Sequence, residues 1–135
     1  ARFGLPPPHP ELTILRFDGP LHFVNAATFE DAVLAVGRDH PRLKVLLLSC
    51  AGINDIDASG IDTLRRIHRQ LADSGRCLAC CGLKKQVIDV MERTGLWSDL
   101  AIHGAYRTED HALQHLLPTL SAPPTPAPQR QGFAW

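Results

Sequence analysis

Few folds can accommodate the short apolar run near the middle of the chain, V-L-L-L-S-C at positions 45–50. Its length is that of one strand, well below the roughly 18 apolar residues that a membrane-spanning helix needs. Successive side chains of a strand point to opposite faces of a sheet, so a strand that is apolar at consecutive positions must be covered on both faces. The run therefore predicts a buried central strand of a largely parallel sheet.

Strand and helix signals alternate on both sides of this run. Further strands are predicted at residues 12–17 and 77–81, a short extended piece at 21–24, and a short last strand at 101–103. Helices are predicted from the N-cap Asn25 to Gly37, from Ser59 to about Gly75, from Lys84 to Thr94 before Gly95, and from Thr108 to Leu120. Alternating strands and helices require crossover connections, which indicates a parallel sheet between helical layers.

Length and composition point to one soluble domain. The 135 residues suit a single modest core, and equal numbers of basic and acidic residues (14 each) give no net field toward nucleic acid. The ends are Pro-rich, so we predict a linker at 1–10, a folded domain at 11–120 and a disordered tail at 121–135. The first ten residues hold one Arg and four prolines and no apolar segment typical of a signal peptide.

The stretch D-I-D-A-S-G at positions 55–60 allows three interpretations. Ser59 with Asp62 fits a capping box, in which the hydroxyl caps a helix and the acid reaches back. Ser59 is also placed where a kinase could add a phosphate at the positive end of a helix. The third interpretation, Asp55 and Asp57 as a magnesium-dependent phosphatase pair, is disfavoured because about five residues separate the pair from the strand and no second acidic cluster is present.

Three further groups of residues are candidates for sites. Cys77 and Cys80 have redox or zinc spacing, but in a strand they point to opposite faces, so we expect reduced, buried thiols and no metal. His111 and His115 lie one helical turn apart without a further ligand, which favours an exposed helix surface. Arg65, Arg66 and Arg69 are expected on the outward side of their helix, as a solvated face or, alternatively, a face that binds an anion or a partner.

Taken together, these residues resemble the STAS domain, named for sulfate transporters and anti-sigma factor antagonists, over about residues 11–120. In antagonists, the second serine of Asp-Ser-Ser-Gly is phosphorylated; Ser59 and Asp57 match that motif, whereas Ala58 replaces the first serine. The segment G-P-L-H-F-V-N-A at positions 19–26 is similar to the transporter branch. The absence of an initial Met fits a domain excised from a longer protein as well as a processed chain.

The resemblance implies an α/β fold with a mixed central sheet of about 4–5 strands and about four helices, mostly on one side. It implies a cytoplasmic regulatory and interaction domain of a bacterial secondary anion (sulfate-type) transporter, at the cytoplasmic face of the inner membrane, and no enzyme activity or cofactor. The interaction loop would contain Asp55, Asp57, Ser59 and Gly60. Expected partners are the transporter's own membrane domain and a dimer mate, or a kinase or regulatory protein; nucleic acid is not expected, and no residue pattern supports nucleotide binding. The alternative is a free-standing anti-sigma factor antagonist that is switched by phosphorylation of Ser59.

Overall fold

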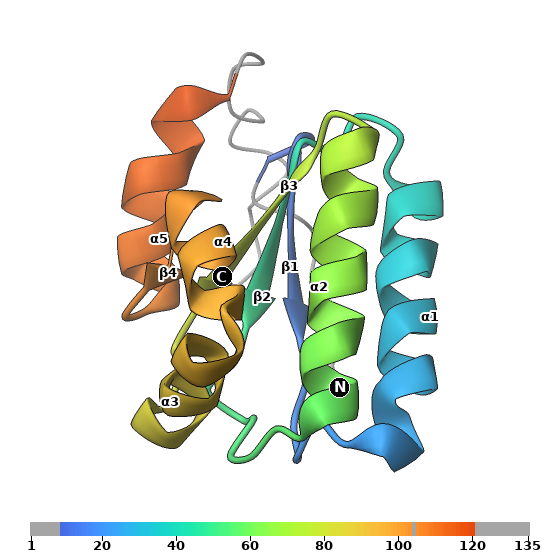
Figure 1. The fold of residues 1–135 in the computed structure, drawn as a ribbon. Helices are drawn as coiled ribbons and strands as arrows, with labels where there is room; N and C mark the ends of the chain where they lie inside the picture. Colours follow the sequence, from blue (N-terminus) through green and yellow to red (C-terminus); the bar gives the residue numbers. More distant parts are fainter. Residues whose placement is uncertain (1–8, 104, 121–135) are drawn as a thin grey trace.

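The computed structural model describes residues 9–103 and 105–120, which form a four-stranded sheet with helices on both faces (Figure 1). The predicted terminal segments, apart from His9 and Pro10, lie outside the described residues. The strands are β1 (Leu12–Arg16), β2 (Val45–Ser49), β3 (Cys77–Cys81) and β4 (Ala105–Tyr106). The helices are α1 (Phe23–Asp39), α2 (Ala58–Asp73), α3 (Lys85–Thr94), α4 (Leu96–His103), α5 (Glu109–Leu116) and the 3-10 helix η1 (Leu117–Thr119).

The strands follow one another across the sheet in the order β1-β2-β3-β4, and all three pairings are parallel. The central strand β2 is the predicted apolar run, and all five of its residues are buried. Antiparallel pairing in the described residues is limited to one bridge, between His9 and Leu12 at the start of β1. The α/β fold expected from the resemblance is confirmed.

The alternation of side chains along β2 divides the core into two parts. Leu46 and Leu48 face a large cluster that also contains buried residues of α1, α2, α3 and α4. Val45 and Leu47 face a smaller cluster that includes Ala112 and Leu116 of α5. Four α-helices therefore cover one face of the sheet and one α-helix covers the other. This agrees with the prediction that the helices lie mostly on one side.

The predicted last strand at residues 101–103 is wrong, because these residues belong to helix α4. Gly95 ends α3 in a left-handed conformation, with φ of 83°, and α4 starts directly after it at Leu96. The last strand comes later, at Ala105–Tyr106. Gly95 ends a helix, as predicted, but the helix that follows it, α4, was not predicted.

The final helix starts where it was predicted to start. Thr108 is the N-cap of α5, and its hydroxyl oxygen accepts a hydrogen bond from the His111 N–H at 3.0 Å. The α-helix ends at Leu116 and continues as η1, which contains Pro118. Proline lacks an N–H to continue the α-helical pattern, so the change to a 3-10 turn at this point is expected.

The cysteines are placed as the strand pattern predicted. Cys80 is buried in the larger cluster under the helices, whereas Cys77 packs against the smaller cluster on the opposite face. Burial raises the pKa of the Cys77 thiol, and burial is also the main reason that the pKa of Cys81 is raised to about 11. Such thiols are poor nucleophiles at neutral pH.

Across the described ranges, no helix is both long and apolar enough to cross a membrane.

Candidate functional site

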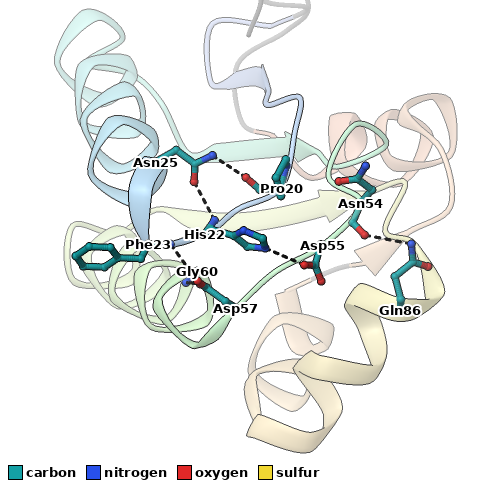
Figure 2. Close-up of polar contacts among 9 residues, drawn as sticks. All are labelled: Pro20, His22, Phe23, Asn25, Asn54, Asp55, Asp57, Gly60 and Gln86. Atoms are coloured by element: carbon teal, nitrogen blue, oxygen red, sulfur yellow. Dashed lines mark hydrogen bonds and ion pairs between the residues drawn. The ribbon is translucent and has the colours of Figure 1, made fainter.

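The candidate site forms where the segment before α1 meets the loop before α2. Leu21 lies beside Ile56 in an isolated parallel bridge. The Leu21 N–H donates to the Asp55 carbonyl at 2.9 Å, and the Asp57 N–H donates to the Leu21 carbonyl at 3.2 Å. This bridge brings together two segments that the sequence places more than 30 positions apart, so that the N-termini of α1 and α2 lie side by side (Figure 2).

One carboxylate caps both helices. Asp57 Oδ1 accepts a hydrogen bond from the Gly60 N–H at 2.9 Å, and Asp57 Oδ2 accepts one from the Phe23 N–H at 3.0 Å. The bond from Gly60 is the main cause that lowers the pKa of Asp57, and the bond from Phe23 and the nearby His22 ring lower it further. A carboxylate in this place is favoured twice, because both helix dipoles present their positive ends to it.

The prediction that Ser59 caps α2 is therefore wrong. The helix begins at Ala58, Asp57 is its N-cap, and Ser59 is the second helical residue. Asp57 takes the role because its side chain can satisfy N–H groups of two helices, whereas Ser59 sits too far inside the first turn. Ser59 is half-buried, and its carbonyl accepts a hydrogen bond from the Thr63 hydroxyl at 2.8 Å.

The junction requires a glycine at position 60. A Cβ at Gly60 would collide with the Leu21 carbonyl oxygen and would lie 2.7 Å from Ile56 Cγ1. Both contacts are closer than any ordinary one, and the nearer atom belongs to the backbone. The glycine of the motif therefore serves the close approach of α2 to the segment before α1.

The start of α1 also differs from its prediction. Asn25 is the third helical residue and not the N-cap, which is His22, and Phe23 and Val24 are helical rather than extended. The Asn25 side chain accepts from the His22 N–H at 2.8 Å and donates to the Pro20 carbonyl at 2.7 Å. The polar residue belongs to a helix start, as predicted, but it acts from inside the first turn (Figure 2).

Asp55 lies at the outer side of the junction. Its Oδ2 lies 2.8 Å from Nε2 of His22, and 64% of its side chain is exposed. The neighbouring Asn54 carbonyl accepts a hydrogen bond from the Gln86 side chain of α3 at 3.2 Å. The loop is thus fixed on both sides, to α1 and to α3, and Asp55 is the carboxylate that remains open to a partner.

Two apolar side chains beside this loop are left in solvent. Phe23 and Val24, in the first turn of α1, are 76% and 86% exposed. Figure 2 shows the Phe23 ring pointing away from the polar residues of the junction. This pair was not predicted as part of a site, although a signal was present: the buried stripe of α1 includes Ala26, Phe29 and Val33, and positions 23 and 24 fall outside that repeat.

A comparison with known families decides the class of protein. A family model described as STAS domain matches residues 7–112. The chain belongs to the STAS domain family. STAS domains are regulatory and interaction domains rather than enzymes. Both oxygens of Asp57 are engaged by backbone N–H groups. Within the described residues, no group of three or more His, Cys, Asp or Glu side chains is placed to hold a metal ion.

Similar proteins occur in both branches of the family. The chain is 23% identical over 122 residues to a probable sulfate transporter 3.4 of Arabidopsis thaliana, covering 84% of this chain and 19% of that protein. The STAS domain of a SulP transporter from Vibrio cholerae has a TM-score of 0.67 at 22% identity, covering 81% of this chain and 83% of that one. A putative anti-sigma factor antagonist from Thermotoga maritima has a TM-score of 0.68 at 19% identity, covering 79% and 88%.

The three arginines predicted as an anion or partner face of this STAS domain have separate environments. Arg66 contacts Glu30 of α1 through two bonds, Nη2–Oε1 at 2.8 Å and Nε–Oε2 at 3.1 Å. This pairing is the main cause that lowers the pKa of Glu30. Arg65 Nη2 donates to the Thr94 carbonyl at the end of α3, at 2.8 Å, and Arg69 is exposed. Two of the three thus tie α2 to its neighbours, and an anion-binding role of this face stays a prediction.

Proposed function

We propose that this STAS domain is the cytoplasmic regulatory and interaction domain of a bacterial secondary anion transporter of the sulfate type. It would lie at the cytoplasmic face of the inner membrane. The surface formed by Phe23, Val24, Asp55 and Ser59, which we call the loop surface, would contact the transporter's own membrane domain or that of its dimer mate. The domain would adjust transport by this contact and not by catalysis.

The observation that carries the proposal is the exposure of Phe23 and Val24. Both belong to the segment G-P-L-H-F-V-N-A, which is similar to the transporter branch, and their side chains are more than three-quarters exposed. Two adjacent apolar side chains held in solvent by a rigid, doubly capped helix start are typical of anchor residues that enter a pocket of a partner. Burying these side chains against a partner would favour binding by about 25 cal/mol for each Å² of apolar surface removed from water.

The charge near the anchors fits a membrane domain as the partner. Asp55 is exposed and contacts His22, the residue that directly precedes Phe23. Short cytoplasmic loops of membrane proteins carry an excess of Lys and Arg. An apolar pair with an exposed carboxylate at its rim is therefore complementary to that surface, and the carboxylate would be repelled by an acidic one.

The test uses the intact gene product, purified and reconstituted in vesicles. Replacing Phe23 and Val24 together by Ser should reduce sulfate uptake at least fivefold while the protein amount and folding stay unchanged. Leu34→Ser is the matched control, because Leu34 is an exposed apolar residue, 44% exposed, farther along the same helix. Unchanged uptake in the double variant, or an equal loss in Leu34→Ser, would contradict the proposal.

The alternative function is a free-standing antagonist switched at Ser59. It is favoured by the position of Ser59 in the first turn of α2, where a phosphate would meet the positive end of the helix dipole. It predicts a gene product without membrane spans and a phosphate on Ser59 that changes the affinity for a partner. Mass spectrometry of the native protein, with Ser59→Ala as the control, distinguishes it from the transporter proposal.

A further inference from the structure

Strand β1 has a free outer edge in the described part of the chain. It pairs with β2 on one side, and the only other pairing of β1 among residues 9–103 and 105–120 is the bridge of His9 with Leu12. The Glu11 carbonyl accepts from the Val45 N–H at 3.0 Å, so Glu11, Thr13 and Leu15 direct their backbone groups toward β2. The alternate residues Ile14 and Arg16 therefore direct their N–H and C=O groups outward. An outer edge of this kind is a template for another extended segment.

A cavity lies next to this edge, between β1 and the C-terminal half of α1. Its volume is about 250 Å³, and small apolar side chains of α1, Ala32, Ala35 and Val36, form much of its wall. Sites for small-molecule ligands usually have about 300–1,000 Å³. The cavity is below that range, and its size suits one inserted side chain better than a separate ligand.

A buried hydroxyl in the cavity wall has no partner. Thr13 lines the cavity, is 9% exposed, and its Oγ1 makes no hydrogen bond to any described residue. A buried polar atom without a partner is costly, and native structures contain few of them. A segment that fills the cavity would therefore also have to bring a hydrogen-bonding group, such as one of its own backbone groups, to the Thr13 hydroxyl.

We propose that this groove, formed by β1 and α1, binds an extended peptide segment of a partner protein. The segment would add to the sheet as a strand beside β1, bonding to the outward groups of Ile14 and Arg16, and would place one aliphatic side chain in the cavity. This is the recognition mode in which backbone bonds supply affinity and a pocket for an alternate side chain supplies specificity. It is a second interaction surface, separate from the loop surface.

The charge of the groove indicates which kind of residue the segment carries two positions from the aliphatic anchor. Asp39 lies in the cavity wall at the end of α1, where the helix dipole is negative, and the described wall residues include no Lys or Arg. A Lys or Arg two positions from the anchor would lie on the same face of the added strand and could reach Asp39. The occupant is thus an extended segment with an aliphatic residue and a basic residue at alternate positions.

The probe is the peptide acetyl-Ser-Thr-Val-Thr-Lys-Ser-amide, titrated into the full chain labelled with ¹⁵N. At saturation, amide exchange of Ile14 and Arg16 should slow at least tenfold, whereas Thr13 and Leu15, already bonded to β2, should change little. A peptide with Asp in place of Val should have no effect. Ala35→Leu, which fills the cavity, should abolish binding, and Ala27→Leu on the exposed side of α1 should not.

Three results would overturn the proposal. The first is unchanged exchange of Ile14 and Arg16 with the Val peptide. The second is slow exchange without peptide: if the Ile14 and Arg16 amides exchange as slowly as that of Thr13 before any peptide is added, the chain itself or a second copy covers the edge. The third is undiminished peptide binding by Ala35→Leu.

Discussion

The two ends of helix α1 present opposite kinds of surface. Its first turn projects Phe23 and Val24 into solvent, whereas its last turns leave a cavity lined by Ala32 and Ala35 beside the edge of β1. Between them, the middle of the helix buries residues such as Phe29 in the core. The inner stripe of α1 therefore serves the fold, and its two ends are suited to partners in different ways: one inserts side chains and the other accepts one.

The two ends of α1 also differ in how tightly they are packed against their neighbours. The first turn is held by backbone contacts of the preceding Leu21 and by the Asp57 carboxylate, and Gly60 is packed directly against Leu21. At the other end, a Cβ added to Gly37 would meet only the terminus of a long side chain, Arg76 Nη1, at 2.8 Å. The following predictions test this difference, in order of decreasing effect.

Gly60→Ala should lower the free energy of unfolding by about 2–3 kcal/mol, because its Cβ would collide with the Leu21 carbonyl and force α2 away from α1. Gly37→Ala is the matched control at the other end of α1. It should be neutral or slightly stabilising, since Arg76 can move and Ala favours a helix more than Gly. Urea unfolding of both variants measures this, and equal losses would show that the first end is not the more constrained one.

Asp57→Ala should lower the thermal unfolding midpoint by about 6 °C, because two helices lose an N-cap acceptor at once. Ser59→Ala should shift the midpoint by only about 1 °C, since the Ser59 hydroxyl does not cap α2. Calorimetry of the two variants checks the assignment. A larger loss in Ser59→Ala than in Asp57→Ala would restore the serine as the cap.

The stability supplied by Asp57 should depend on pH in the acid range. Its pKa is lower in the folded state than in the unfolded state, mainly because of the Gly60 N–H, so its contribution is complete above the ordinary Asp pKa of about 3.9. The contribution should decline as pH falls through the lowered folded-state pKa. The difference in unfolding free energy between wild type and Asp57→Asn should therefore shrink between about pH 5 and pH 2. A difference that stays constant over this range would argue against a charged cap.

Replacing Phe23 and Val24 together by Ser should change the unfolding free energy of the isolated chain by only about 0.5 kcal/mol, because both side chains are already in solvent. Phe29→Ala, in the buried stripe of the same helix, should cost about 3–5 kcal/mol. Chemical denaturation of the two variants separates a surface role from a core role. A loss above about 2 kcal/mol in the double Ser variant would place the pair in the fold rather than in an interface.

Local signals predicted the parts of the fold that depend on neighbouring residues. The apolar runs predicted β2 and β3 because a strand buried on both faces needs no polar alternation. Gly95 and Thr108 marked a helix end and a helix start because their capping partners lie within four residues. The helix α4 was missed because its start follows the stop of α3 without a connecting loop.

The candidate site was predicted in its location but not in its bonding. The first N–H of α1, that of Phe23, is bonded to Asp57, 34 positions away, and no rule based on neighbouring residues can foresee that bond. Asn25 and Ser59 were both predicted as N-caps because each is a good capping residue close to a helix start. In the structure, the N-cap of α1 is His22, with Asn25 bonded to it from inside the first turn, and the N-cap of α2 is Asp57. Only the packing of α1 against α2 determines the outcome.

The most direct test of the loop surface is the accessibility of Val24 in the intact gene product. Val24→Cys and the control Leu34→Cys would be labelled with a maleimide, first in the isolated chain and then in native membranes; Cys50, Cys80 and Cys81 are buried and Cys77 is half-buried. Both introduced cysteines should react rapidly in the isolated chain. In membranes, labelling of Val24→Cys should slow at least tenfold while that of Leu34→Cys stays the same. Equal labelling of the two positions in membranes would contradict docking through the first turn of α1.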